Sequence, residues 1–244
     1  YGASIMTTPV GSVIEHSGNG LMANALVGRQ WRAFTDCCST GNTQEFFYTV
    51  SGTGAALNGQ ASGTDNAFGI LRLALGTVAT SRGAIHSNVY TILNFGKGRC
   101  YFATRIRHVT LSDATNAYTD RFGFIDSITG ESVDGAFFRY THSVNGGRFQ
   151  AVTRSNNTET LTDTGITVVA NTFYKLVVVV NAAGGSVSFF IDDVPVATIT
   201  TNIPTGTGRD TGYGDMVLRS LGTAAVNALD FDYLEVVINS TTER

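Results

Sequence analysis

The sequence predicts an all-β protein built as an antiparallel two-sheet sandwich. From about residue 45 onward, apolar and polar residues alternate along short segments rich in β-branched and aromatic side chains. Gly, Asn and Asp separate these segments, and 28 glycines against three prolines suit many tight turns. Only FGILRLALG, residues 68–76, resembles a helix, and its two glycines lie too close together for a stable one.

The first expected strands are FFYTV, ILRLAL, VYTILNF and RCYFATRIRHV, at residues 46–50, 70–75, 89–95 and 99–109. In the last of these, alternate residues form an apolar face that we expect to be buried. That face consists of Cys100, Phe102, Thr104 and Ile106. The other face carries Arg105 and Arg107, so we expect it to meet water or a groove, on a strand more exposed than its neighbours.

The next expected strands are RFGFID, AFFRYT, RFQAVT and FYKLVVVVN, at residues 121–126, 136–141, 148–153 and 173–181. The first three alternate in the same way as the earlier segments. Within the fourth, residues 176–180 are Leu or Val at every position. A strand that is apolar on both faces is typical of the middle of a sheet.

The last expected strands are VSFFID, VPVATITT, MVLRS and LDFDYLEVVI, at residues 187–192, 194–201, 216–220 and 229–238. Asp192 and Asp193 fall between the first two, where a two-residue turn is expected. Asp tolerates the left-handed conformation that such turns need, so these carboxylates are predicted to form a turn and not a site. Pro195 has no N–H to donate, which favours an edge strand.

The charge of the chain limits its partners. Charged residues make up 14% of the sequence, against roughly 25% in ordinary soluble domains, and the formal net charge is −3. No run of Lys or Arg could neutralise a phosphate backbone, so no nucleic-acid partner is expected. The longest apolar runs, such as residues 176–180, are far too short to insert into a membrane.

The domain organisation predicted from these patterns is simple. Residues 41–244 are expected to form a single sandwich domain, and the weakly patterned residues 1–40 an N-terminal arm or edge segment. Trp31 makes that segment a plausible docking arm. The three cysteines are Cys37, Cys38 and Cys100; free buried thiols are favoured, and a bridge from Cys100 to either of the other two is the alternative.

The strongest catalytic candidate is LDFDYLE near the end of the chain. Asp230 and Asp232 alternate onto one face of a strand, and Glu235 joins that face only if a bulge intervenes. Two carboxylates about 5–9 Å apart are what glycoside hydrolysis requires. The spacing is similar to the E-x-D-x-x-E strand of laminarinase-like glycoside hydrolases, with Asp in place of the first Glu. The alternative is a polar outer face on a terminal strand.

Two loops carry candidate binding residues. In residues 111–121, Asp113, Asn116 and Asp120 could ligate Ca²⁺, and Tyr118 could stack on a sugar. The alternative is a strand connection with Asx turns, so a cofactor is not expected overall. In residues 206–215, the glycan-binding candidates are Arg209 and Tyr213.

Four segments together resemble a known family. They are GILRLALGTVATSRGAI, RFGFIDS, the long stretch from VTRSNNTETL to FFIDDVPVATITTNIPTG, and SLGT followed by LDFDYLEV. In this order, over roughly residues 65–240, they resemble concanavalin A-like (laminin-G-like) jelly-roll domains of tailed-bacteriophage virion proteins. Asp193 stands where relatives usually have Gly.

The resemblance implies a jelly roll that works in a virion. We expect a non-enzymatic structural protein, for example a capsid decoration or a head or tail fibre component. It would be assembled in the host cytoplasm, contact other virion proteins, form a homo-oligomer and bind host-surface glycan on its concave face or through the two loops. The alternative is a polysaccharide-cleaving enzyme that uses Asp230 and Asp232. The fold itself implies no activity.

Overall fold

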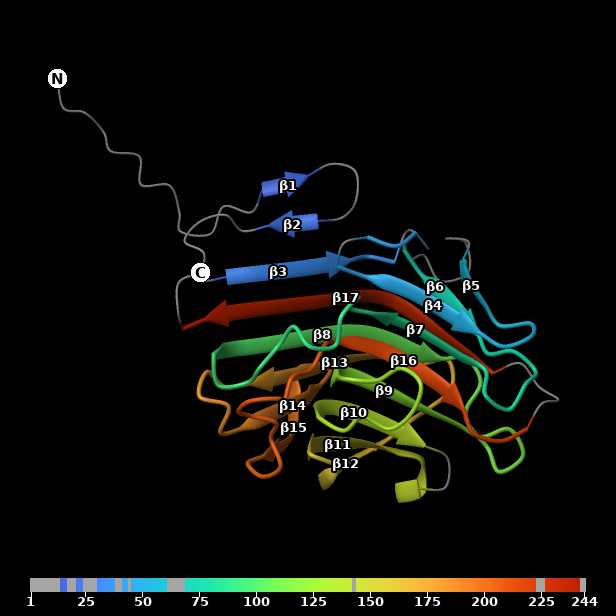
Figure 1. Ribbon diagram of the computed structural model, residues 1–244. Helices are drawn as coiled ribbons and strands as arrows, with labels where there is room; N and C mark the ends of the chain where they lie inside the picture. Colours follow the sequence, from blue (N-terminus) through green and yellow to red (C-terminus); the bar gives the residue numbers. More distant parts are fainter. Residues whose placement is uncertain are drawn as a thin grey trace.

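The computed structural model is a sandwich of two antiparallel sheets (Figure 1). It describes residues 14–16, 21–23, 30–37, 41–43, 45–60, 69–141, 144–222 and 227–241. The all-β class and the antiparallel two-sheet arrangement are confirmed. No helix in the described part of the chain is long and apolar enough to cross a membrane.

The first sheet has seven strands. In spatial order they are β12 (Thr158–Thr167), β11 (Arg148–Ser155), β10 (Gly135–Thr141), β9 (Tyr118–Ile125), β16 (Gly214–Arg219), β7 (Arg82–His86) and β4 (Phe47–Ser51). A short 3-10 turn, η2 (Val144–Gly147), precedes β11. This sheet is called the seven-stranded sheet below.

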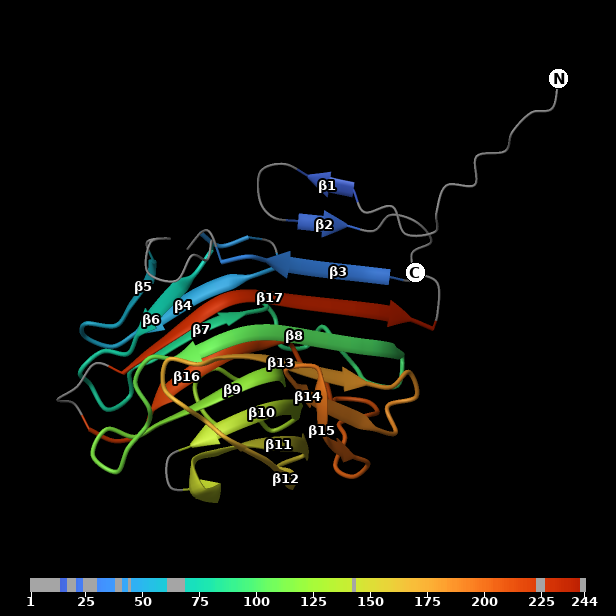
Figure 2. The same ribbon diagram turned by 180° about the vertical axis from the view of Figure 1, so that it is seen from behind.

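The second sheet has eight strands, seven of them in one continuous order. These are β15 (Val194–Ile199), β14 (Val187–Ile191), β13 (Phe173–Val180), β8 (Gly98–His108), β17 (Ala228–Ser240), β6 (Leu71–Ala74) and β5 (Ala56–Gly59). The eighth, β3 (Gln30–Thr35), pairs with the second half of β17. Figure 2 shows β13, β8 and β17 side by side. β1 (Ile14–His16) and β2 (Leu21–Ala23) pair only with each other.

The core lies between the sheets and is aromatic. Phe102 and Phe124 meet edge to face across it at 6.0 Å, and Phe138 and Phe189 do so at 5.3 Å. The face of β8 that carries Phe102 is buried as the alternation predicts. Aromatic pairs in this geometry add about 0.5–1.5 kcal/mol beyond their burial, so the sandwich rests on interlocked rings and not on aliphatic packing alone.

Most of the expected strands are confirmed, and the exceptions have physical causes. Residues 89–95 do not form a strand: Leu93 and Phe95 make only isolated bridges within a loop. β7 and β12 were not anticipated, because RGAIH and TETLTDTGIT contain few large apolar residues. The part of residues 1–40 that β3 occupies is an edge strand of the sandwich, and Trp31 packs on Tyr213 at 5.8 Å.

The expected hairpin turn is confirmed. Asp192 and Asp193 have φ values of 50° and 67°, which join β14 to β15 in two residues. The Asp192 carboxylate accepts the backbone N–H of Lys175 at 2.9 Å. β15, with Pro195, lies at the edge of its sheet, as predicted.

Two of the three cysteines lie in the described part of the chain. Cys37 and Cys100 are buried, and burial raises the pKa of the Cys100 thiol to about 12. The buried Cys100 thiol is therefore expected to react poorly. Cys38 lies outside the described residues.

Candidate functional site

An open hollow lies at the end of the sandwich where β8 begins and β17 ends (Figure 1). It is an open groove with a volume of about 490 Å³, within the range of roughly 300–1,000 Å³ of small-molecule sites. Two loops line it, one before β8 and one between β15 and β16. The lining residues are Asn94, Phe95, Gly96, Lys97, Thr205, Gly206, Thr207, Gly208 and Asp210.

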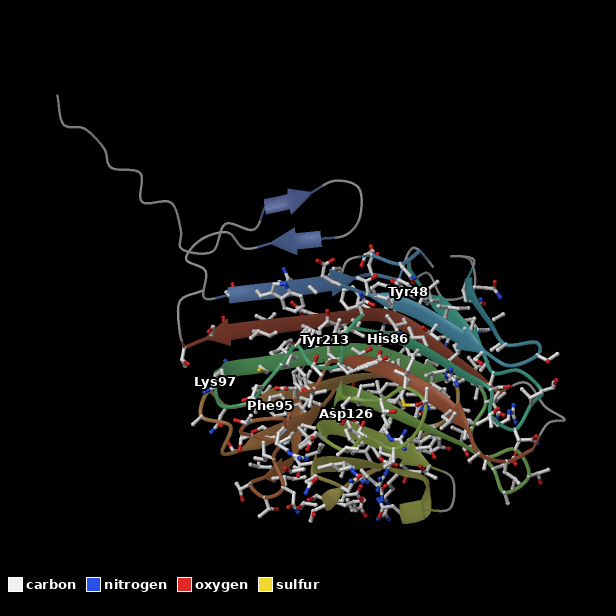
Figure 3. The ribbon with its side chains drawn as sticks, viewed as in Figure 1. Tyr48, His86, Phe95, Lys97, Asp126 and Tyr213 are labelled. Atoms are coloured by element: carbon white, nitrogen blue, oxygen red, sulfur yellow. The ribbon has the colours of Figure 1, made fainter. Side chains whose placement is uncertain are left out.

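The two loops are held together by backbone pairing. Leu93 pairs with Thr211, and Phe95 pairs with Thr205. The Phe95 ring points into the core and meets Phe124 edge to face at 5.3 Å. Figure 3 shows Phe95 and Lys97 near this end of the molecule. The two loops that form the groove are therefore fixed by backbone pairing and by the packing of Phe95 in the core.

Glycine lets the groove rims approach a third loop closely. A Cβ on Gly184 would come within 2.6 Å of the Thr205 side chain and 2.9 Å of the Gly96 nitrogen. Gly206 has φ +96°, and a Cβ added to it would meet no atom within 4 Å, so its backbone is exposed on the rim. The Gly206 carbonyl already accepts the Asn94 side-chain amide and the Arg209 backbone N–H, so this rim is held in place from both loops.

The polar groups of the groove are few and partly preorganised. Asn94 donates through its side-chain amide to the Gly206 carbonyl at 2.6 Å and to the Asp210 carboxylate at 3.1 Å. These bonds fix the Asn94 amide and one oxygen of Asp210. Within the described residues, the ammonium of Lys97 contacts no partner and is exposed. A donor cation and a carboxylate acceptor thus face the same open volume.

Arg209 and Tyr213, the candidates in the second loop, do not line the groove. One guanidinium nitrogen of Arg209 contacts the Asp134 carboxylate at 3.2 Å and the Asn156 amide oxygen at 3.0 Å. Arg209 therefore ties the groove loop to its neighbours. Tyr213 is 1% exposed, and its hydroxyl donates to the Glu45 carbonyl at 2.8 Å. The expectation that Tyr213 contacts a ligand is wrong, because its ring belongs to the core.

The other candidate loop, residues 111–121, lies at the opposite end of the sandwich. The Asp113 carboxylate accepts the backbone N–H groups of Thr115 and Asn116, both at 2.7 Å. This is the Asx turn that was the alternative to a ligand site. Tyr118 is 1% exposed, and its hydroxyl donates to the Thr110 carbonyl. The expectation that Tyr118 is exposed for stacking is wrong.

The three calcium candidates do not converge. Asp120 is fully buried, where it lies 2.5 Å from Nε2 of His108 and accepts the backbone N–H of Tyr140. Burial raises the pKa of Asp120, and the charge of His108 opposes that shift. Its carboxyl faces the core and cannot join Asp113 or Asn116 around one ion. No group of three His, Cys, Asp or Glu in the described part of the chain is placed to hold a metal.

The catalytic candidates lie on β17, on the outer face of the eight-stranded sheet. A bulge between Phe231 and Tyr233 shifts the register, so Asp230 and Glu235 do point to the same side. Asp230 is fully buried, and its oxygens bind Arg72 at 2.7 and 2.9 Å and Arg107 at 2.5 and 3.0 Å. Both oxygens of this carboxylate are occupied by guanidinium groups.

The other two carboxylates are paired as well. Asp232 binds Arg105 at 2.5 Å, and Glu235 binds Arg32 at 2.7 Å. Phe173 lies under the guanidinium groups of Arg105 and Arg107, 4.2 and 4.6 Å from their centres. The expectation that β8 is a more exposed strand is wrong, because β8 lies between β13 and β17. Arg107 is covered by its pairing with Asp230, whereas Arg105 keeps 39% of its side chain exposed.

Comparison with known proteins places the chain in a family. The family model described as SO2946-like, C-terminal domain, matches residues 66–232. The chain belongs to this family. A solved structure, that of a protein of unknown function, SO2946 from Shewanella oneidensis MR-1, is similar to this chain with a TM-score of 0.65. The two are 11% identical, over 91% of this chain and 92% of that one. No curated protein matches the sequence.

Other solved structures share the fold of this SO2946-like domain. An endo-1,3-beta-glucanase from Streptomyces sioyaensis is 15% identical, with a TM-score of 0.57 over 89% of this chain and 99% of that one. Peanut lectin is 12% identical, with a TM-score of 0.55 over 87% and 99%. The concanavalin A-like jelly roll is thereby confirmed. Because one neighbour is a hydrolase and the other a lectin, the fold leaves the activity open.

The SO2946-like domain thus has a groove that the sequence only half predicted. The rim at 206–210 lies in a loop singled out for its glycines, whereas Asn94 and Lys97 fell in or beside a segment expected to be a strand. The signal that could have identified the second rim is NFGKG, residues 94–98, where two glycines flank the only lysine of the loop.

Proposed function

We propose that this protein is a non-catalytic carbohydrate-binding module that works as a structural part of a virion. The observation that carries the binding role is the groove between residues 94–97 and 205–210. Sugar hydroxyls each donate and accept hydrogen bonds, and a site for them needs a few fixed groups of both kinds. Asp210 supplies an acceptor and Lys97 a donor.

The paired carboxylates on β17 support a non-catalytic role. A retaining or inverting glycosidase needs one carboxylic acid that can protonate the leaving group and a second carboxylate open to the sugar or to water. Asp230 is shielded from solvent and bound by two arginines. Asp232, which is partly exposed, is bound by Arg105. A substrate would have to displace these guanidinium groups before it met either carboxylate.

The virion role rests on the sequence resemblance over roughly residues 65–240 and on the sparsely charged surface. Such a protein would contact other virion proteins and form a closed homo-oligomer. The measurement is co-sedimentation of the tagged chain with particles, together with the mass of the isolated chain. A chain that stays monomeric and never associates with particles contradicts the virion role and leaves the groove prediction intact.

The binding role is tested with the full chain on a glycan array, followed by titration of the best neutral oligosaccharide. Replacing Asp210 with Ala removes a charged acceptor from the groove, and hydrogen bonds to charged groups contribute about 1.5–3 kcal/mol. We therefore expect binding to weaken at least about tenfold. Asp193→Asn is the matched control, because this exposed carboxylate lies on the far turn; binding should not change.

Two outcomes would overturn the binding role. One is that the unmodified chain binds no sugar at millimolar concentration. The other is that Asp210→Ala binds as tightly as the unmodified chain, which would place the site elsewhere.

A further inference from the structure

Three arginines converge on the outer face of the seven-stranded sheet, away from the groove. Arg121, Arg139 and Arg154 come from the adjacent strands β9, β10 and β11. Their side chains are 5%, 13% and 13% exposed. Guanidinium groups are seldom this well covered unless something pairs with them. These three residues are called the arginine cradle below.

One carboxylate from a loop occupies the centre of the arginine cradle. Oε1 of Glu131 lies 3.0 Å from Nε of Arg121, 3.8 Å from a terminal nitrogen of Arg139 and 3.7 Å from one of Arg154. Its other oxygen pairs with Arg121. Glu131 is itself 38% exposed. A single accessible carboxylate is therefore the shared partner of three nearly buried cations.

The strand register places two of the three arginines where their charges destabilise the sheet. Arg139 lies directly opposite Arg121 in the pairing of β9 with β10. Like charges directly opposite each other destabilise a sheet. An anion between them reverses that effect, and Glu131 supplies it. Sites where a fold keeps such a local conflict are commonly functional.

The carboxylates around the arginine cradle do not neutralise all of its positive charge. Glu159 on β12 accepts two hydrogen bonds from Arg139, at 2.9 and 3.0 Å, and one from Arg154 at 3.1 Å. Burial alone would raise the pKa of Glu159, but its bonds to Arg139 and Arg154 outweigh burial and lower that pKa. Three guanidinium groups thus face two carboxylates. Nε of Arg154 is buried without a hydrogen-bond partner.

The loop that delivers Glu131 is built as a separate flap. Asp126 closes its neck, because the Asp126 carboxylate accepts the backbone N–H groups of Val133 and Asp134 at 3.0 and 2.9 Å. Figure 3 marks Asp126 over the seven-stranded sheet. Within the loop, Ile128 packs on the apolar cluster of this face, which includes Phe137 and Val152. Ile128 and Glu131 hold residues 127–132 against the sheet, together with Arg121, which donates to the Gly130 carbonyl at 3.1 Å.

We propose that the arginine cradle is a binding site for the carboxylate or sulfate groups of an acidic glycan, and that Glu131 closes it as an internal substitute for that ligand. Planar guanidinium forks match both oxyanions. Phe137 and Val152 are fully buried in the cluster that contains Ile128, so they offer an apolar floor to a sugar ring only when residues 127–132 lift away with Glu131. The proposal rests on the proposed carbohydrate binding only in naming a glycan as the carrier of the anion.

The test is Glu131→Gln in the full chain, which removes the competing charge and keeps the shape of the side chain. Three probes are titrated at low salt: oligogalacturonate for the carboxylate source, a heparin oligosaccharide for the sulfate source, and inorganic sulfate for the bare anion. We expect at least one glycan to bind at least about tenfold more tightly to Glu131→Gln than to the unmodified chain. The gain should shrink as salt screens the charges.

Matched variants separate the cradle from general charge effects. Asp163→Asn also removes one negative charge, from an exposed carboxylate on β12 that pairs with Arg148, and should leave binding unchanged. Adding Arg154→Gln to Glu131→Gln should abolish the gain. A neutral glucose oligosaccharide should bind Glu131→Gln and the unmodified chain equally. Failure of neutral sugar binding would contradict the groove, and failure of anionic glycan binding would contradict the arginine cradle.

A folded Glu131→Gln variant that binds neither anionic glycan nor sulfate more tightly overturns the proposal. If that variant fails to fold, the unmodified chain decides the matter. Its arginine side-chain NMR signals should shift on adding millimolar oligogalacturonate or heparin oligosaccharide at low salt. Unshifted signals overturn the proposal as well.

Discussion

At the scale of single residues, we expect Asp215 to carry a proton in the folded protein. Its carboxyl oxygen lies 2.6 Å from the Thr104 hydroxyl, which is also 2.9 Å from the Tyr233 carbonyl. The Thr104 hydroxyl has one proton to donate and two acceptors within reach, the Asp215 carboxyl and the Tyr233 carbonyl. A protonated Asp215 removes this competition, because its own O–H can donate to Thr104. Asp215 is fully buried, and its other oxygen has no partner. Burial raises the pKa of Asp215 far above its usual range.

Asp215→Asn should therefore change how stability depends on pH. The pKa of Asp215 is higher in the folded protein than in the unfolded chain. The contribution of Asp215 to the free energy of unfolding is therefore complete at acid pH and is lost as the pH rises toward the folded pKa. Between the two pKa values the loss is about 1.4 kcal/mol per pH unit. Asn cannot ionise, so the variant does not lose this stability. In urea unfolding, its free energy of unfolding relative to that of the unmodified chain should therefore rise from pH 4 to pH 8. A difference that stays constant with pH contradicts the protonated state.

Asp230 and Asp232 should differ sharply when each is changed to Asn. Asp230 is fully buried between two arginines, and Arg107 is nearly as well covered. Breaking such a pair leaves a buried charge and costs about 3–5 kcal/mol. Asp232 and Arg105 are partly exposed, and pairs of that kind contribute about 0–1 kcal/mol. The free energy of unfolding is measured for both variants. If Asp230→Asn and Asp232→Asn lower it by similar amounts, the assignment of the ion pairs on β17 is contradicted.

At the scale of elements, the sequence predicted what depends on nearest neighbours along the chain. The inward face of β8 and the turn at Asp192 follow from alternation and turn chemistry within a few residues. The ion pairs between β8 and β17 do not, because they depend on the register of two strands more than a hundred residues apart and on a bulge at Asp232. Without the register, Arg105 and Arg107 could not be recognised as partners of the suspected catalytic carboxylates.

The hairpin between β14 and β15 permits a test with two substitutions at one position. Asp193 has φ 67°, a conformation that Asp tolerates, whereas a β-branched side chain crowds the backbone there at a cost of about 1–2 kcal/mol. Asp193→Val should therefore lower the free energy of unfolding by that amount. Asp193→Gly removes the strain but gives the unfolded chain more freedom and loses the exposed pair with Lys175, so it should lie within about 1 kcal/mol of the unmodified chain. If Val is tolerated as well as Gly, the turn conformation is wrong.

At the scale of the whole molecule, the position of the sites could not be predicted from sequence. The groove joins residues 94–97 to residues 205–210, and the two candidate loops fall at opposite ends of the sandwich. Local patterns predict that a loop is rich in glycine or Asp, but the sheet topology decides which loops meet. Tyr118 and Tyr213 show the same limit, because aromatic residues inside polar loops were buried by strands distant in sequence.

The N-terminal region offers the last test of the whole fold, because β3 completes the eight-stranded sheet. β3 pairs with β17 from Leu234 to Asn239, and Trp31 covers Tyr213 in the core. Deleting residues 1–40 would expose this edge and unpair Glu235 from Arg32. Removing a paired strand with a half-buried Trp should cost at least about 3 kcal/mol, which lowers Tm by more than about 5 °C. A deletion of residues 1–29 keeps β3, so the difference between the two deletions measures the strand. If the two deletions have the same Tm, β3 adds nothing to the stability of the sandwich, and the first strand that the sandwich needs is β4.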